Sequence, residues 1–270
     1  MNKTGNSELA AACHKNLMRV PRFINGQWQW ISDPVTREEP FTVSWSDDSG
    51  GESPVSAGST LLWAWPHEPE MLALGHVLLD CAPSSQSLHR EAQVEQKDES
   101  SYHVRIGKKL PGVPPVPPAA WDAEALFGAM HAFISAGGHW DDTGCFHRAG
   151  IFDPVAGELL FRAEDIGRHN CVDRLAGWSV LRQVPLSDKV LLVSARLTSS
   201  LCAKALRAGF RILVSRSAVT SAAIHMSREA GATLAGFART TERRFTLFTD
   251  TAHRLGRPEI SGIPAPDEND

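Results

Sequence analysis

One arrangement of apolar and polar positions occurs twice in the second half of the chain. The segments "VLLVSARLTSSLCAKALRAG" and "ILVSRSAVTSAAIHMSREAG" share a short apolar run, then Ser and Arg, then Thr-Ser, then a helical pattern that closes on Ala-Gly. A short apolar run is typical of a strand buried on both faces, and Gly209 and Gly231 suit the left-handed position that follows a helix. The pattern therefore predicts a β-α-β-α unit.

Further elements extend this unit on both sides. A third strand, "TLAGFA", is followed by a hairpin-like loop, "RTTERR", and a last strand, "FTLFT". Upstream, "GELLFRAED" predicts a strand, residues 169–181 a helix, and "AWDAEALFGAMHAFISAGG" an amphipathic helix that stops at its glycines. Alternation of strands and helices indicates a largely parallel sheet with helices packed over it.

The first half of the chain follows a different pattern. Short strands are predicted at "TVSW", "STLLWAW" and "YHVRI", and "HEPEMLALGHVLLD" has helical spacing. This predicts a small α+β domain over residues 21–110, after a flexible leader at 1–20. The proline-rich stretch 111–118 is expected to be a linker or loop, followed by the α/β domain at 119–257 and a tail at 258–270.

Composition narrows the class of protein. Hydrophobic residues make up 42% of the 270 positions and charged residues 21%, which is ordinary for a globular protein. No apolar run approaches the roughly 20 residues of a membrane span, and the start lacks a signal-peptide pattern, so we expect a cytoplasmic protein without a membrane partner. Five scattered cysteines without a C-x-x-C argue against a disulfide framework and a zinc ribbon.

Charge is unevenly distributed along the chain. Between Arg196 and Arg257 there are eleven Lys or Arg against three Asp or Glu, a local charge of +8 in a chain whose net charge is −4. Positive charge that lines a cleft attracts anions more strongly than the net charge of the whole protein suggests. Surface arginines without a ligand would produce the same count, so this observation alone leaves both interpretations open.

The predicted strand ends carry polar side chains at the positions where open α/β sheets bind ligands. Ser194 and Arg196 follow one strand, Ser215 and Arg216 the next, and Arg239 ends the third. Arginine grips phosphate bidentately, and two of these strand ends open helices whose free N–H groups favour anions. We therefore expect a phosphorylated ligand.

No standard nucleotide or catalytic motif accounts for such a ligand. The chain lacks G-x-G-x-x-G, a Walker lysine loop, G-x-S-x-G and H-E-x-x-H. It also lacks the H-x-E and P-C-x-x-C ligands of the zinc deaminases. We expect no protein-held metal and no nucleic-acid partner.

The stretch "EDIGRHNCVDR", Glu164 to Arg174, concentrates polar chemistry at the start of a predicted helix. His169 and Asp173 are i, i+4 neighbours, so the acid is expected to orient the imidazole and favour its charged form. Asp165 lies where a helix cap would. The stretch either stabilises this helix locally, or forms a polar wall of the cleft with Arg168 facing the anion.

The order of motifs from Thr143 onward resembles the formate dehydrogenase accessory sulfurtransferase family, FdhD/NarQ. The resemblance rests on "TGCFHRAGIFDPVAGELLFRAEDIGRHNCVDRLAGW", "DKVLLVSARLTSSLCAKALRAG", "ILVSRSAVTSAA" and "TLAGFAR", with weaker agreement at "REEP" and "HEPEMLALGHVL". It implies a cytidine-deaminase-like, three-layer α/β/α C-terminal domain without the deaminase zinc, and a homodimer.

The resemblance also implies a function, partners and a ligand. Family members take persulfide sulfur from a cysteine desulfurase and pass it to the molybdenum bis(pterin guanine dinucleotide) cofactor of formate dehydrogenase, for which GDP would be a mimic. The family's cofactor-binding loop falls on Phe237, Ala238, Arg239, Thr240, Thr241, Glu242, Arg243 and Arg244. The strand-end residues Arg196, Ser215 and Arg216, together with Arg168, complete the expected cofactor site.

The chain departs from the family at the sulfur-carrying cysteines. The family has a C-G-x-C-G pair in a loop that corresponds to "KKLPGVPPVPPAAW", which contains no cysteine. Persulfide relay requires a thiolate. The nearest thiol is Cys145, two residues before His147, whose imidazole would activate it if charged and close, although a buried inert thiol is the simpler interpretation.

Three functions stay open at this point. The first is a sulfurtransferase with Cys145 as the carrier and His169 and Asp173 as further catalytic residues. The second is a chaperone that binds the molybdenum cofactor without sulfur chemistry, which the missing cysteine pair favours. The third is a metabolic enzyme unrelated to molybdenum on the same scaffold, which the retained motifs disfavour.

Overall fold

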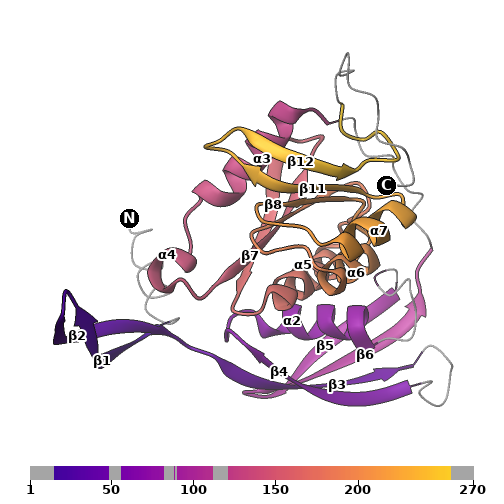
Figure 1. Ribbon diagram of the computed structural model, residues 1–270. Coiled ribbons are helices and arrows are strands. Elements are labelled where there is room, and N and C mark those ends of the chain that lie inside the picture. The colour runs from indigo at the N-terminus through magenta and orange to yellow at the C-terminus, as the bar shows by residue number, and fades with distance from the viewer. Residues whose placement is uncertain (1–14, 49–55, 82–87, 89, 112–120, 257–270) are drawn as a thin grey trace, which may run out of the picture.

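A six-stranded sheet forms the centre of the second half of the chain (Figure 1). The computed structural model describes residues 15–48, 56–81, 88, 90–111 and 121–256. The strand order is β12-β11-β10-β9-β7-β8. The strands are β7 (His147–Asp153), β8 (Glu158–Asp165), β9 (Val190–Val193), β10 (Ile212–Ser215), β11 (Thr233–Arg239) and β12 (Arg244–Thr249).

The sheet is mixed, which corrects the expectation of a largely parallel one. β9, β10 and β11 are parallel, as the repeated pattern predicts. β7 runs antiparallel to both β8 and β9, and β12 folds back antiparallel to β11. The two reversals arise because β7–β8 and β11–β12 are hairpins, which reverse the chain, whereas helical crossovers do not.

Helices cover both faces of this sheet, which confirms the predicted three-layer α/β/α arrangement. Leu191 and Val193 of β9 face a core shared with α5 (Arg168–Arg182) and α6 (Ser199–Arg207). The alternate residues, Val190 and Leu192, face a second core that contains α3 (Ala123–Ser135). α7 (Ser221–Glu229) packs beside α6, and both helices are followed by a left-handed glycine, Gly209 (φ +101°) and Gly231 (φ +61°), as expected.

The first half of the chain forms its own sheet, with order β4-β3-β6-β5. Its strands are β3 (Glu39–Asp47), β4 (Ser56–Ala64), β5 (Arg90–Asp98) and β6 (Ser101–Lys109). The helix α2 (Pro69–His76) continues into one π-helical turn, η1 (Val77–Cys81). α2 lies between this sheet and α5, so the two halves of the chain share a helix–helix contact (Figure 1).

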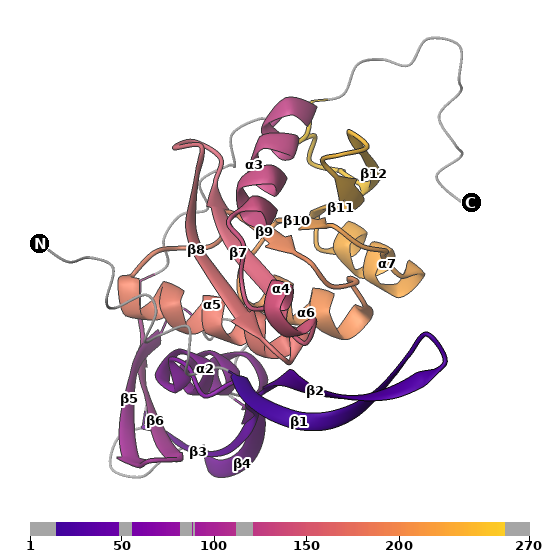
Figure 2. The same cartoon turned by 90° about the vertical axis from the view of Figure 1, so that its left-hand side faces the viewer.

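A long hairpin, β1 (Lys15–Ile24) and β2 (Gln27–Thr36), extends away from the rest of the molecule (Figure 2). Its turn is Asn25–Gly26, with φ of +49° and +83°. Asn-Gly is the residue pair that a two-residue hairpin turn favours. The expected leader at 1–20 is therefore wrong for Lys15–Val20, which pair with β2 throughout.

Several expected segments fall outside the described residues. These are positions 1–14 of the leader, positions 112–118 of the proline-rich stretch, and the tail at 258–270. Among the helices that are described, none has the length and apolar composition required to cross a bilayer.

Candidate functional site

The predicted ligand-binding residues meet at one edge of the six-stranded sheet, which we call the strand-end edge. β8, β9, β10 and β11 all run in the same direction, so their carboxyl ends share this edge. The first residues of the antiparallel strands β7 and β12 lie there too. The edge therefore gathers His147, Asp165, Arg196, Arg216 and the loop from Arg239 to Arg244. The strand pattern predicted this position for Arg196, Arg216 and the loop.

Two serine hydroxyl groups hold the loops of this edge in place. The Oγ of Ser215, which is fully buried, donates to the carbonyl of Ala195 at 2.8 Å and accepts from the N–H of Ser217 at 2.9 Å. The Oγ of Ser194 accepts from the N–H of Arg148 at 2.9 Å. Ser215 therefore shapes the loops that carry Arg196 and Arg216, and does not present a free hydroxyl to a ligand.

Three arginines at the edge lack acidic partners. Among the described residues, none provides an ion pair or a side-chain hydrogen-bond acceptor for Arg168, Arg196 or Arg216. The side chains of Arg196 and Arg216 are exposed, whereas the Nε of Arg168 is buried without an acceptor. A buried N–H without an acceptor is costly, so the edge is suited to an anion that would accept from it.

His147 lies among these cations. Burial, followed by the charges of Arg168 and Arg196, lowers the pKa of its imidazole, although Asp165 acts in the opposite direction. The imidazole is therefore neutral at pH 7. It can donate or accept a hydrogen bond at the edge, but it adds no positive charge.

The loop between β11 and β12 is paired mostly within itself. Glu242 accepts from Arg239 at 3.0 Å and from Arg244, and these hydrogen bonds lower the pKa of its carboxyl. The guanidinium of Arg244 lies 5.9 Å from the ring centre of Phe237, a residue with a left-handed φ of +52°. Arg243 pairs with Glu124 of α3, so the loop arginines are less available to a ligand than those at the strand ends.

The remaining predicted loop residues differ in exposure. Ala238 is fully buried and can offer a ligand only its backbone. Thr240 is half-buried and Thr241 is exposed.

The expected pairing of His169 with Asp173 is wrong. The Nε2 of His169 lies 3.1 Å from the Oγ of Ser200, at the start of α6. Both carboxylate oxygens of Asp173, which is fully buried, accept from the Nζ of Lys204 at 2.7 Å. Burial and the charges of Lys204 and Arg168 lower the pKa of His169, so its neutral form is favoured, contrary to the sequence-based expectation.

Asp165 joins the start of α5 to the first half of the chain. Its Oδ1 accepts from the N–H of Gly167 and from Asn170 Nδ2, both at 2.9 Å. The N-cap of α5 is Gly167, without a side-chain cap, so the expected capping role of Asp165 is wrong. Its Oδ2 accepts from Arg174 at 2.9 and 2.6 Å. Arg174, 2% exposed, also donates to the carbonyl of Trp65 at 2.7 Å.

The stretch Glu164 to Arg174 is therefore structural in its buried part, whereas its half-buried residues lie where a ligand could contact them. Asp165, Asp173 and Arg174 stabilise the junction of the two halves. Arg168 and His169 face the strand-end edge.

The predicted carrier thiol, Cys145, is exposed in the turn that follows α4 (Trp140–Thr143). A charged imidazole at His147 is needed to activate this thiol. Burial and the neighbouring arginines lower the pKa of His147 and so favour its neutral form. Cys171 and Cys202 are buried, and burial raises the pKa of both thiols, so they are packing residues as expected. Cys13 lies outside the described residues.

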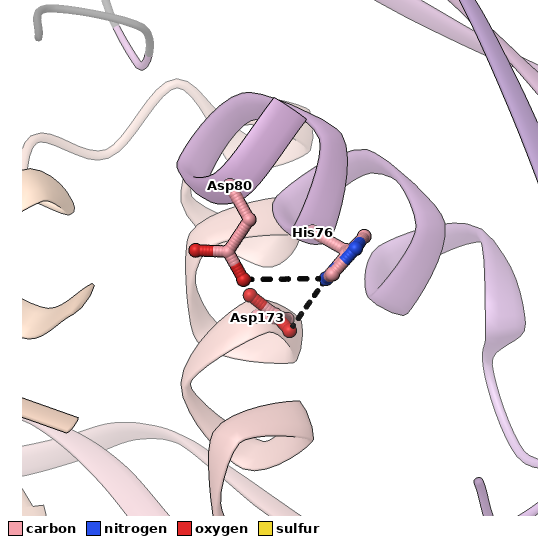
Figure 3. A group of neighbouring side chains, drawn as sticks. All are labelled: His76, Asp80 and Asp173. Carbon is pink, nitrogen blue, oxygen red and sulfur yellow. Dashed lines mark ion pairs between the residues drawn. The ribbon is translucent and has the colours of Figure 1, made fainter. Parts of the chain in front are cut away.

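A second polar cluster, which the sequence reasoning missed, joins α2 and η1 to α5 and α6. Figure 3 shows three of its side chains, His76, Asp80 and Asp173. The Nδ1 of His76 lies 3.4 Å from Asp173 Oδ2 and 3.5 Å from Asp80 Oδ2. The Nζ of Lys204 lies 2.8 Å from Asp80 and 2.7 Å from Asp173, and Arg207 pairs with Asp80 at 2.6 Å.

The three groups drawn in Figure 3 are close enough to share a cation. The ammonium of Lys204 already occupies the position between the two carboxylates, so the charge of the cluster is balanced by the chain itself. The i, i+4 spacing of His76 and Asp80 was visible in the sequence. The approach of Asp173 and Lys204 was not, since it depends on the packing of α5 on α6.

Comparison with known proteins gives one consistent family. The model of the FdhD/NarQ family matches residues 96–255. "Protein FdhD" of Methanocaldococcus jannaschii is 38% identical over 111 residues, which cover 41% of this chain and 48% of that protein. "Sulfur carrier protein FdhD" of Mycolicibacterium paratuberculosis is 38% identical over 144 residues, which cover 53% of this chain and 52% of that protein. The chain thus spans about half the length of the curated relatives it matches.

A solved structure shares the fold over nearly the whole molecule. It is that of a proposed formate dehydrogenase accessory protein from Desulfotalea psychrophila, with a TM-score of 0.71, covering 90% of this chain and 99% of the other. The sequence identity is 19%, so this likeness concerns the fold alone.

Proposed function

Because the chain belongs to the FdhD/NarQ family, we propose that it is an accessory protein for the maturation of a molybdenum-containing formate dehydrogenase. In this proposal it binds the pterin guanine dinucleotide form of the molybdenum cofactor at the strand-end edge. Formate dehydrogenase, a cysteine desulfurase and a second copy of the chain are its partners. The names of the relatives, which describe FdhD as a sulfur carrier, support the accessory role.

The observation that carries the ligand proposal is the set of unpaired arginines at the edge. Arg168, Arg196 and Arg216 come from three different loops or helix starts that the sheet brings to one side. α5, α6 and α7 all begin at this edge, and their first N–H groups add partial positive charge. A diphosphate is an anion whose oxygens can accept from several guanidinium groups at once.

Binding of GDP, measured by calorimetry, tests this proposal. We expect the purified protein to bind GDP and Arg216→Ala to weaken the affinity about ten- to a hundredfold, since one charge-assisted contact contributes roughly 1.5–3 kcal/mol. The matched control is Arg228→Ala, which removes an exposed arginine from the opposite end of α7 and should leave the affinity unchanged. A folded protein that binds no GDP at millimolar concentration would contradict the proposal.

A second candidate function is a cofactor chaperone that moves no sulfur. The absence of cysteine from the stretch "KKLPGVPPVPPAAW" favours it, and so does the neutral imidazole beside Cys145. The two candidates differ in one measurable property, which is whether any cysteine of the chain accepts sulfur.

A further inference from the structure

The exposed apolar side chains of the described residues are concentrated at the β1–β2 hairpin. Of twelve large apolar side chains that are exposed, six belong to the hairpin: Leu17, Met18, Phe23, Trp28, Trp30 and Val35. Three more, which we call the hairpin base, are Leu61, Trp63 and Trp140. A concentration of exposed apolar side chains is typical of a surface that another molecule covers.

The hairpin base lies where the hairpin joins the rest of the molecule. Trp63 of β4 pairs with Pro40, four positions after the end of β2. Trp140 begins α4, and in the same helix the Oγ1 of Thr143 lies 2.8 Å from the Oγ1 of Thr36, the last residue of β2. The hairpin extends away from its own base (Figure 2) and leaves these side chains uncovered.

One face of the hairpin carries its aromatic residues. Directly opposite residues of an antiparallel pair share a face, and the register places Phe23 opposite Trp28. It also places Pro21 opposite Trp30. The rings of Phe23 and Trp28 meet edge to face at 5.3 Å. The guanidinium of Arg19 lies 5.5 Å from the ring centre of Trp30, so these five residues form one surface, which we call the arm face.

The edges of the hairpin disfavour pairing with a strand of another chain. The pair that flanks a two-residue turn is hydrogen-bonded, and such pairs alternate with pairs whose backbone N–H groups point outward. Counting from the pair Ile24–Gln27, Pro21 of β1 and Pro34 of β2 occupy outward positions. Proline has no N–H to donate there, so neither edge offers an uninterrupted row of donors. A partner is therefore held by the side chains of the arm face.

We propose that the arm face binds the hairpin base of a second copy of the chain, so that each copy covers the base of the other. The inference rests on the second copy named in the proposed function and deepens it by assigning the contact surface. In such a twofold arrangement the same contact is made twice, which leaves no apolar arm uncovered. The base borders the strand-end edge, because α4 ends four positions before His147, so each edge lies beside the arm of the other copy.

The area of the two surfaces agrees with a stable dimer. Five aromatic side chains are between 53% and 72% exposed: Phe23, Trp28 and Trp30 of the arm face, and Trp63 and Trp140 of the base. An aromatic side chain buries roughly 150–250 Å², so at this exposure the five supply roughly 450–750 Å² per copy. A stable interface buries about 800 Å² per partner, and the aromatic residues would supply most of it.

Charge is complementary between the two surfaces. Arg19 is the charged residue of the arm face. In the base, Asp141 and Asp142 are exposed beside Trp140. Asp141 pairs with Arg148, but its side chain remains 57% exposed. An arginine that meets these carboxylates across the interface makes a charge-assisted contact, which favours binding of the arm to the base over binding of arm to arm.

Sedimentation velocity of the full chain at micromolar concentration tests the inference, and we expect the unaltered protein to be a dimer. The arm variant, Trp28→Ser with Trp30→Ser, should raise the dissociation constant of the dimer about a hundredfold or more, since each interface tryptophan contributes about tenfold or more. The base variant, Trp63→Ser with Trp140→Ser, should do the same. Val155→Ser is the matched control, because it removes an exposed apolar side chain outside both surfaces and should leave the dimer intact. Circular dichroism should be the same for all variants.

Mixing the two variants tests the exchange of arms itself. A dimer of either variant with itself loses both contacts. A mixed dimer keeps one, between the intact arm of the base variant and the intact base of the arm variant. The mixture should therefore dimerise more tightly than either variant alone.

Three outcomes would overturn the inference. A dimer that persists in the arm and base variants would be formed by another surface. A mixture that dimerises no better than its components would show that the arm does not bind the base. A monomeric unaltered protein would leave the arm face to a protein of different sequence.

Failure of this inference is distinguishable from failure of the proposed function. The arm face and the base contain none of the arginines proposed to bind GDP. A monomeric unaltered protein that binds GDP rejects the inference and leaves the ligand proposal. A dimer that responds to both variants but binds no GDP rejects the ligand proposal and leaves the inference.

Discussion

Buried charges at the junction of the two halves each have a specific partner. Asp165, Asp173 and Arg174 are at most 2% exposed, and an isolated charge at such a depth would be strongly destabilising. Asp165 pairs with Arg174, and Asp173 pairs with Lys204, 31 positions away in the chain. Sequence reasoning could identify this polar stretch but not its partners, because spacing along one helix says nothing about which other helix packs against it.

The imidazole of His76 is expected to make stability depend on pH in the alkaline range. Its pKa of about 9 in the folded chain exceeds the ordinary value of 6.5, so the folded state binds this proton more tightly than the unfolded state. The resulting stabilisation is complete below about pH 6.5 and is lost as the pH rises through 9. At about 1.4 kcal/mol for each pKa unit, it amounts to roughly 3 kcal/mol.

Urea denaturation at pH 6 and pH 9.5 measures this effect. The free energy of unfolding of the unaltered protein should fall by about 2–3 kcal/mol more than that of His76→Gln. His225→Gln is the matched control, since His225 is 73% exposed, and it should keep the pH dependence of the unaltered protein. Equal pH dependence in the unaltered protein and His76→Gln would show that the cluster does not hold the proton.

At the scale of elements, prediction succeeded where local pattern and topology agree. The strands β9, β10 and β11 and the helices between them follow the repeated pattern, and each helix ends at its expected glycine. The hairpin β1–β2 was missed although Asn25–Gly26 marks its turn, because most of its side chains are exposed and carry no core-facing pattern. Exposed aromatic residues on the hairpin, Phe23, Trp28 and Trp30, show that no core orders them within the described chain.

The contact between α2 and α5 depends on two glycines. A Cβ on Gly177 would lie 2.0 Å from the carbonyl oxygen of Met71, and one on Gly75 would lie 1.8 Å from that of Asp173. Both obstacles are backbone atoms of the facing helix, which cannot move without separating the helices. Gly177→Ala should therefore lower the free energy of unfolding by about 3 kcal/mol or more, as overpacking does.

Gly128→Ala in α3 is the matched control, because no atom lies within 4 Å of the added Cβ and the position is exposed. This substitution should raise stability by about 0.5–1 kcal/mol, as replacement of a helical glycine by alanine does. Urea denaturation compares the two variants. A Gly177→Ala protein as stable as Gly128→Ala would mean that α2 and α5 are farther apart than the structure shows.

At the scale of the whole molecule, the excess of positive charge in the last third includes arginines at one edge of the sheet, and its link to an anionic ligand stays a prediction. The sequence placed arginines at three strand ends, and the parallel order of β9, β10 and β11 brings these ends together. Which arginines are free could not be predicted, because Glu242 and Glu124 pair with the loop arginines only in the folded chain. Within the part of the chain that the structure describes, the arginines of this edge without an acidic partner are therefore Arg168, Arg196 and Arg216.

The two halves of the molecule are expected to unfold together. Arg174 of α5 donates to the carbonyl of Trp65 and to Asp165, and Lys204 of α6 pairs with Asp80 of η1, so polar contacts join the halves as well as the α2–α5 contact. Five of the eight tryptophans precede residue 66, so tryptophan fluorescence mainly reports the first half. Far-ultraviolet circular dichroism reports the helices, most of which lie in the second half.

Coincident urea transitions by the two methods are the expected result, since coincidence of different probes is the mark of a single cooperative unit.

Arg174→Met should lower the midpoint of the fluorescence transition more than that of the dichroism transition. The substitution leaves Asp165 buried without its main cation, at a cost of about 3–5 kcal/mol, and frees three carbonyl groups of the first half. Arg182→Met, at the exposed end of α5, should shift neither midpoint. Separate transitions in the unaltered protein would show that the halves are stable independently, and that the buried charges serve a purpose other than joining them.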